Sequence, residues 1–214
     1  MRLDSPPRVL ITGAATGIGR ACADALGARG ADLVLCDNDA PTLRDATEEL
    51  GAIGRFCDVA SEASVAVLAA DIIESFHSLD LLINAAGGGY ERTLGMYRVS
   101  RALLPALRRG PHYKLMLNIQ PEEDADVAIF PYASSGQAFQ RLSSALAAET
   151  KGTGITVLIG DPETSRISQV VPDPDAGPQA ATYGLPTRNH CSGALVAQIA
   201  ELMGPGHWGQ RQAC

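Results

Sequence analysis

The sequence predicts a doubly wound α/β fold, in which helices cover both faces of a mostly parallel sheet. Short runs of Val, Ile and Leu alternate with helix-like stretches along the chain. These runs are apolar on both faces, which is typical of parallel strands buried between two helix layers. A length of 214 residues, of which 46% are hydrophobic, suits a single domain, residues 1–214, with a full core.

Strands are predicted where an apolar run is short and bounded by turn residues. For a doubly wound sheet we expect the strand order 3-2-1-4-5-6, with a ligand crevice at the carboxyl ends of the first and fourth strands. The six predicted strands lie at residues 8–12, 31–36, 54–58, 79–84, 114–119 and 155–159.

Helices are predicted between these strands from their start and stop residues. Pro41 suits the first turn of a helix that stops at Gly51, and Ser61 is a suitable N-cap for the next one. The predicted helices lie at residues 18–29, 41–50, 62–76, 93–109, 132–151 and 193–203.

The segment after the sixth strand breaks the alternation. Five prolines lie between residues 160 and 186. Proline removes a backbone donor and interrupts a helix, so no regular helix is expected through this part of the chain. We predict a long, flexible, lid-like loop at residues 160–188.

Composition excludes several classes of function. The net charge is −7 and the chain has no run of five basic residues, so neither nucleic acid nor a membrane surface is an expected partner. The first residues lack the apolar core of a signal peptide, and no apolar run is long enough to span a membrane. The odd set of five cysteines has no CxxC spacing, which favours reduced thiols, a cytoplasmic location and no metal site.

A glycine-rich turn joins the first predicted strand to the first helix, with the sequence Thr12-Gly13-Ala14-Ala15-Thr16-Gly17-Ile18-Gly19. Glycines allow a tight turn and a close approach of the backbone to a pyrophosphate, and the helix N-terminus offers free N–H donors. The pattern predicts dinucleotide binding and a Rossmann-type fold; an ordinary glycine-rich turn is the alternative. The predicted cofactor-binding residues here are Gly13, Thr16, Gly17, Ile18 and Gly19.

Asp37 closes the second predicted strand. A carboxylate at this point can accept both ribose hydroxyls of an adenosine and would repel a 2′-phosphate. Neither Thr16 nor Asn38 supplies a cation to offset that repulsion. Asp37 therefore favours NAD over NADP, and the alternative is that it only caps a turn.

With these residues in place, the chain resembles the short-chain dehydrogenase/reductase family. Thr12–Gly19 meets the family's TGxxxGIG pattern, Asp58-Val59 matches its adenine-contacting pair, and Asn84-Ala85-Ala86-Gly87 matches its Asn-Ala-Gly motif. The resemblance implies a Rossmann-type sheet, oxidoreductase chemistry and a nicotinamide cofactor. It adds six expected cofactor-binding residues, namely Asp58, Val59, Asn84, Ala85, Ala86 and Gly87.

The catalytic residues that the resemblance implies are mostly replaced. The family uses Tyr-x-x-x-Lys, in which tyrosine is the general acid/base and lysine lowers its pKa. Tyr132 matches the tyrosine, but Gly136 stands where lysine is expected. The family's serine position falls on Gln120 or Pro121, and its helix asparagine falls on Arg92. Gln120 can still donate a hydrogen bond to a carbonyl, whereas Pro121 cannot.

Three functional interpretations stay open. In the first, the chain binds NAD(H) but has lost most or all dehydrogenase activity, and acts as a dinucleotide-dependent scaffold, sensor or partner subunit. In the second, it is an active NAD-dependent oxidoreductase on a small carbonyl or alcohol, with Tyr132 as acid/base and another group in place of lysine. In the third, cofactor binding is lost as well. The region that builds the family's substrate pocket is shorter here, so the substrate stays unassigned.

The resemblance also implies that the chain forms a homodimer. The family commonly dimerises through the two helices that correspond to residues 93–109 and 132–151. The second of these carries small and apolar residues at helical spacing, and a closed two-fold contact would bury such a face. We expect a homodimer that uses Ala138, Phe139, Leu142, Ala145 and Leu146.

Overall fold

A computed structural model describes residues 5–87, 89–120, 135–170, 180–182 and 192–203. Its sheet has the strand order β3-β2-β1-β4-β5-β6-β7-β8, so the predicted 3-2-1-4-5-6 order is confirmed and extended by two strands. The first six strands are mutually parallel. They are β1 (Arg8–Thr12), β2 (Asp32–Asp37), β3 (Ile53–Phe56), β4 (Leu81–Asn84), β5 (Leu115–Ile119) and β6 (Thr156–Asp161).

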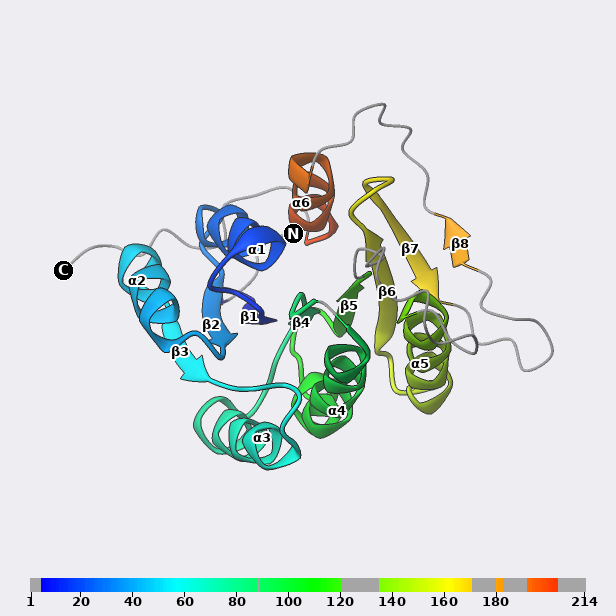
Figure 1. Cartoon of the computed structure of the whole chain (residues 1–214), viewed down its shortest axis with the longest axis horizontal. Helices are drawn as coiled ribbons and strands as arrows, with labels where there is room; N and C mark the ends of the chain where they lie inside the picture. The colour runs from blue at the N-terminus through cyan, green and yellow to red at the C-terminus, as the bar shows by residue number, and fades with distance from the viewer. Residues whose placement is uncertain (1–4, 88, 121–134, 171–179, 183–191, 204–214) are drawn as a thin grey trace.

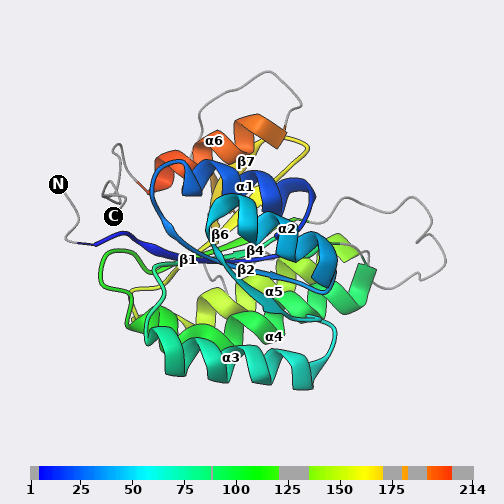
Figure 2. The same cartoon turned by 90° about the vertical axis from the view of Figure 1, so that its left-hand side faces the viewer.

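The helices form one layer on each face of the sheet (Figures 1 and 2). One layer contains α1 (Gly17–Gly27), α2 (Ala40–Leu50) and α6 (Ser192–Leu202). The other contains α3 (Glu62–Phe76), α4 (Gly89–Arg108) and α5 (Ser135–Glu149). Each layer packs on its own buried apolar cluster, because the strands are apolar on both faces as the sequence predicted.

The segment after β6 differs from its prediction. The loop expected at residues 160–188 is wrong at two places, where β7 (Arg166–Val170) and β8 (Ala180–Thr182) extend the sheet in antiparallel pairing. Residues 171–179 and 183–188 of that prediction lie outside the described residues. The Asp161 carboxylate accepts hydrogen bonds from the backbone N–H groups of Glu163 and Thr164, which closes a tight turn. Pro162 lies inside that turn, and β7 contains no proline, so strand pairing is possible there.

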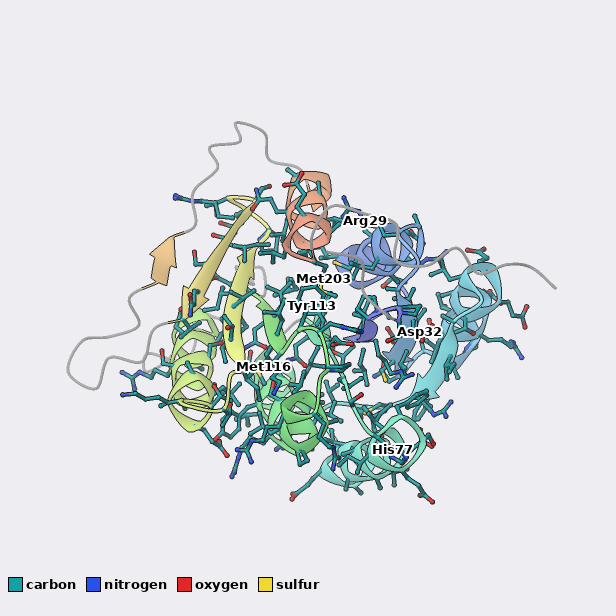
Figure 3. All side chains as sticks on the ribbon, turned by 180° about the vertical axis from the view of Figure 1, so that it is seen from behind. Arg29, Asp32, His77, Tyr113, Met116 and Met203 are labelled. Carbon is teal, nitrogen blue, oxygen red and sulfur yellow. The ribbon has the colours of Figure 1, made fainter. Side chains whose placement is uncertain are left out.

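The buried carboxylate of Asp80 links several chain segments at the amino ends of the strands. Asp80, only 2% exposed, accepts hydrogen bonds from the backbone N–H groups of Arg8, His112 and Tyr113 at 2.9–3.0 Å. It therefore links β1, β4 and the turn before β5. On the same side of the molecule, the Tyr113 hydroxyl donates to the carbonyl of Met203 at 2.6 Å, which ties the end of α6 to β5 (Figure 3).

Within the described residues, no helix is both long enough and apolar enough to cross a membrane. The cytoplasmic location expected from the sequence stays a prediction.

Candidate functional site

The glycine-rich turn lies at the carboxyl end of β1 and touches the turn after β4. Ala14 N–H donates to the carbonyl of Cys36 at 3.1 Å, which holds the turn against β2. Gly13 has φ +65°, and a Cβ built there would lie 2.6 Å from the backbone nitrogen of Ala86. A Cβ on Gly19 would lie 2.1 Å from the carbonyl oxygen of Gly13. Glycine is therefore required at position 13 for the two turns to meet, and at position 19 for the start of α1 to pack on the glycine-rich turn.

Gly17 differs from these two glycines because it faces open space. Its φ is +57°, and nothing lies within 4 Å of a Cβ built there. Gly17 is the first residue of α1, and the side chain of its N-cap, Thr16, makes no capping hydrogen bond. The first turn of α1 therefore combines open space with uncapped N–H donors and the positive end of the helix dipole, which fits a phosphate group.

Asp37 ends β2 beside this turn. One carboxylate oxygen accepts from Ala15 N–H at 3.0 Å and the other from Asp39 N–H at 3.1 Å. Asp37 therefore does cap local backbone, as the alternative interpretation held. The carboxylate still has acceptor capacity, because an ionised carboxylate has about four lone-pair sites. Both roles are compatible at this position.

Asp58 and Val59 follow β3 and pack under α4. The Asp58 carboxylate accepts from Ala60 N–H at 3.0 Å, and Arg98 of α4 donates to the carbonyl of Ala60 at 3.1 Å. A Cβ on Gly95 would lie 2.6 Å from the carbonyl oxygen of Val59. Gly95 was missed in the sequence, where the only sign of it is a glycine inside a predicted helix.

The motif after β4 begins with a buried amide. Asn84, 4% exposed, donates to the hydroxyl of Ser100 at 3.0 Å and to the side-chain oxygen of Asn118 at 2.9 Å. Asn118 in turn donates to Ser143 of α5 at 3.2 Å. The Asn84 side chain therefore joins β4, β5 and α4 beneath the site, and its predicted contact with a cofactor stays a prediction. Ala85 and Ala86 are half-buried above it, and Gly87 is exposed.

The predicted catalytic positions are only partly described. Tyr132 and Pro121 lie outside the described residues. Arg92 lies in the first turns of α4, and Gly136 lies in the first turn of α5.

Gln120 is the one residue of the degenerate catalytic set whose side-chain contacts are described. Its backbone N–H donates to the carbonyl of Gly160 at 2.8 Å, which fixes the main chain at the carboxyl end of β5. Its side-chain oxygen accepts from Nε2 of Gln140 in α5 at 3.2 Å. Sequence reasoning missed Gln140, because no motif marks it.

The buried cysteines are packing residues. Burial raises the pKa of the Cys22 thiol to about 12 and also raises the pKa of Cys36 and Cys57. These thiols are therefore protonated at neutral pH and make poor nucleophiles. Among the described residues, no group of three or more His, Cys, Asp or Glu side chains is arranged to hold a metal ion.

The sheet order and the position of the glycine-rich turn define the class of protein: a Rossmann-type nucleotide-binding domain. Comparison with known proteins specifies the class further. The family model described as "short chain dehydrogenase" matches residues 7–103. The L-fucose dehydrogenase of Oryctolagus cuniculus is 30% identical over 193 residues, covering 78% of this chain and 68% of that protein. Dehydrogenase/reductase SDR family member 7B of Mus musculus is 28% identical, covering 90% and 68%.

Solved structures agree with this assignment. A short-chain dehydrogenase from Streptomyces avermitilis is 25% identical, with a TM-score of 0.70 over 95% of this chain and 86% of that one. The Pseudomonas aeruginosa RhlG/NADP active-site complex is 27% identical, with a TM-score of 0.62 over 73% and 71%. The chain therefore belongs to the short-chain dehydrogenase/reductase family of oxidoreductases.

Proposed function

We propose that this chain binds NAD(H) at the carboxyl ends of β1 and β4 and catalyses hydride transfer weakly or not at all. It would then act as a dinucleotide-dependent scaffold, sensor or partner subunit. The observation that carries the binding proposal is the open position at Gly17, at the uncapped start of α1. The similarity to the RhlG/NADP complex of Pseudomonas aeruginosa supports a nicotinamide dinucleotide as the ligand.

The residues that would hold the cofactor follow from the geometry and the family motifs. The N–H groups at the start of α1, from Gly17 to Gly19, would hold the pyrophosphate. Asp37 would accept the adenosine ribose hydroxyls, and Asp58-Val59 would contact the adenine. Residues 85–87 would line the middle of the crevice. NAD(H), when bound, supplies or accepts a hydride.

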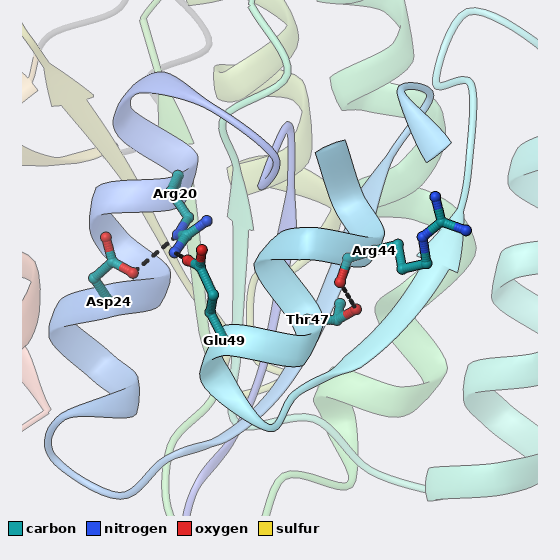
Figure 4. Close-up of polar contacts among 5 residues, drawn as sticks. All are labelled: Arg20, Asp24, Arg44, Thr47 and Glu49. Atoms are coloured by element: carbon teal, nitrogen blue, oxygen red, sulfur yellow. Dashed lines mark hydrogen bonds and ion pairs between the residues drawn. The ribbon is translucent and has the colours of Figure 1, made fainter. Parts of the chain in front are cut away.

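The charges around Asp37 favour NAD over NADP. Arg20, which directly follows the glycine-rich turn, pairs with Asp24 of α1 at 2.9 Å and with Glu49 of α2 (Figure 4). Carboxylates therefore hold its guanidinium between the two helices, which supports the proposal that Arg20 is not a 2′-phosphate ligand. The Asp37 carboxylate is then left to repel that phosphate.

Replacing Asp37 with Ala is expected to weaken NADH binding about tenfold or more and to narrow the preference over NADPH. The reason is the loss of charge-assisted hydrogen bonds to the ribose, which contribute roughly 1.5–3 kcal/mol each. Fluorescence titration with NADH and NADPH measures the ratio of the two affinities. Asp39→Ala is the control, because it removes the N-cap of α2 but leaves Asp37 in place. The affinity ratio of this variant should equal that of the native protein. Equal native affinity for NADH and NADPH would refute the preference.

Replacing Gly17 with Ala tests the binding site itself. Gly51, at the end of α2, has nearly the same φ, +59°, and likewise nothing within 4 Å of a built Cβ. Ala at either position should cost about 1–2 kcal/mol of stability, from left-handed backbone strain. Only Gly17→Ala places a methyl group in the proposed phosphate space, so it alone should weaken NADH binding about tenfold or more, a loss of roughly 1.4 kcal/mol. Equal NADH affinities of the two variants would contradict the proposal.

The second candidate function, an active NAD-dependent oxidoreductase that uses Tyr132, is favoured by one observation. The amide of Gln120 keeps a hydrogen-bond donor at the end of β5, where the family places a serine. That donor can polarise a carbonyl. It does not replace the cation that is missing at position 136.

The proposed homodimer needs a narrower interface than the sequence predicted. Phe139 and Leu146 are 2% and 0% exposed and belong to the core of the protomer, so they are wrong as interface residues. They turn inward because α5 packs one apolar stripe on the sheet. Ala138 and Leu142 are half-buried and Ala145 is exposed, so these three stay available for a contact between copies.

Sedimentation velocity at micromolar concentration is expected to show a dimer, and Ala145→Glu is expected to shift it to monomer. Both copies would bring a glutamate into the contact, so two like charges would be desolvated there. Val67→Glu is the control, because Val67 is a highly exposed apolar residue on α3, outside the proposed contact. A native monomer would contradict the prediction.

A further inference from the structure

The pair Gln120–Gln140 lies where a doubly wound sheet binds ligands. Gln120 is the first residue after β5, at the carboxyl edge of the sheet, and its main chain is bonded to Gly160 on β6. This edge also carries the turns after β1 and β4 that make up the proposed cofactor site. A side chain fixed at this point is therefore placed beside any ligand that occupies the crevice.

The two ends of the Gln120 amide have different surroundings. Its oxygen accepts from Nε2 of Gln140 at 3.2 Å, across twenty residues of chain. Its own amino group, with two N–H donors, makes no hydrogen bond to any described residue. Within the described part of the chain, the acceptor end of the amide is therefore occupied, and its donor end has no partner.

We propose that Gln140 is a positioning residue that holds the oxygen of Gln120, so that the Gln120 amino group donates to the carbonyl oxygen of a small neutral ligand beside the dinucleotide. This inference rests on the proposed function, because it assumes that the crevice holds NAD(H). An uncharged amide suits an uncharged oxygen acceptor. It has no proton to release at neutral pH, so it binds and polarises a carbonyl without acting as a general acid.

Binding to the NADH-saturated protein tests the donor role. The probes are cyclohexanone and methylenecyclohexane, which have the same shape but differ in the oxygen acceptor. Ligand-observed NMR gives both affinities in native protein and in Gln120→Met. We expect Gln120→Met to bind cyclohexanone roughly three- to tenfold more weakly, the effect of one neutral hydrogen bond, and methylenecyclohexane equally well. In ¹⁵N–¹H spectra, the side-chain amide signals that Gln120→Met removes should shift with the ketone alone.

Two substitutions at Gln140 test the positioning role. A carboxylate from Gln140→Glu only accepts hydrogen bonds, so the Gln120 amino group would turn toward it and present its oxygen to the ligand. An ammonium from Gln140→Lys only donates, so it would keep the native orientation. We expect Gln140→Glu to weaken cyclohexanone binding as much as Gln120→Met does, and Gln140→Lys to stay within about twofold of native, less than the change expected from losing one hydrogen bond.

The outcomes separate this inference from the proposed function. NADH affinity is measured in the same samples, and native protein that fails to bind NADH overturns both proposals. If NADH binds, three results overturn only the inference. They are undetectable binding of cyclohexanone, equal ketone affinity in native protein and Gln120→Met, or equal effects of Gln140→Glu and Gln140→Lys.

Discussion

The purified protein, saturated with NADH, is expected to oxidise its cofactor no faster than background with common ketones, aldehydes or quinones. A tyrosine with an unperturbed pKa near 10 is ionised in only about one molecule in a thousand at pH 7. Lowering that pKa by two units takes about 2.7 kcal/mol of differential stabilisation, and Gly136 has no side chain to supply it. Because general acid/base catalysis contributes about 10²–10⁴ in rate, its loss is the largest effect expected for this protein.

NADH absorbance with a panel of carbonyl substrates measures the turnover, and Gly136→Lys tests the cause. We expect Gly136→Lys alone to leave activity well below that of an active enzyme, because the family's serine and asparagine are also replaced. A native turnover number near the enzyme median of about 10 s⁻¹, abolished by Tyr132→Phe, would establish the active-enzyme alternative.

Replacing Asp80 with Ala is expected to lower the free energy of unfolding by about 3–5 kcal/mol, out of the 5–15 kcal/mol typical of a domain. The carboxylate accepts three backbone N–H bonds from Arg8, His112 and Tyr113 and is almost fully buried. Ala would leave these three donors without their acceptor at the junction of β1, β4 and β5. The loss should be cooperative across the whole sheet.

Urea denaturation followed by circular dichroism measures the change in unfolding free energy. Asp80→Asn should also destabilise the protein, because its amide amino group would face backbone donors in place of one carboxylate oxygen. Asp45→Ala is the matched control, since Asp45 is an exposed carboxylate on α2, and it should change stability by less than about 0.5 kcal/mol. If Asp80→Ala changed the unfolding free energy as little as Asp45→Ala does, the role of Asp80 in linking β1, β4 and the turn before β5 would be refuted.

A homodimer through α4 and α5 would relate the proposed NAD(H) binding to the proposed role as a scaffold, sensor or partner subunit. A chain that binds NAD(H) without transferring hydride still changes its surface at the crevice when the cofactor is bound. The two helices of the proposed contact, α4 and α5, both reach that crevice, since α4 packs against Val59 at Gly95 and α5 carries Gln140. A second copy bound to α4 and α5 would therefore lie close to the occupied site.

The sequence by itself determined the order of the first six strands and the place of the glycine-rich turn. β1, β2, β4 and β5 are short and apolar on both faces, which is a property of consecutive residues. The Thr12–Gly19 pattern is likewise local, because glycine permits backbone angles that other residues avoid. The absence of a lysine four residues after Tyr132 can also be read from the sequence, once the family resemblance is known.

Only the tertiary structure decided which distant groups meet. The pairing of Gln120 with Gln140, the close approach of Gly95 to Val59 and the three donors on Asp80 join segments that no sequence spacing relates. The antiparallel course of β7 follows from a turn at Asp161 and a free edge on β6, neither of which has a periodic pattern. Local preferences act over a few residues, whereas these contacts depend on how the whole chain packs, and that is where the candidate site acquires its chemistry.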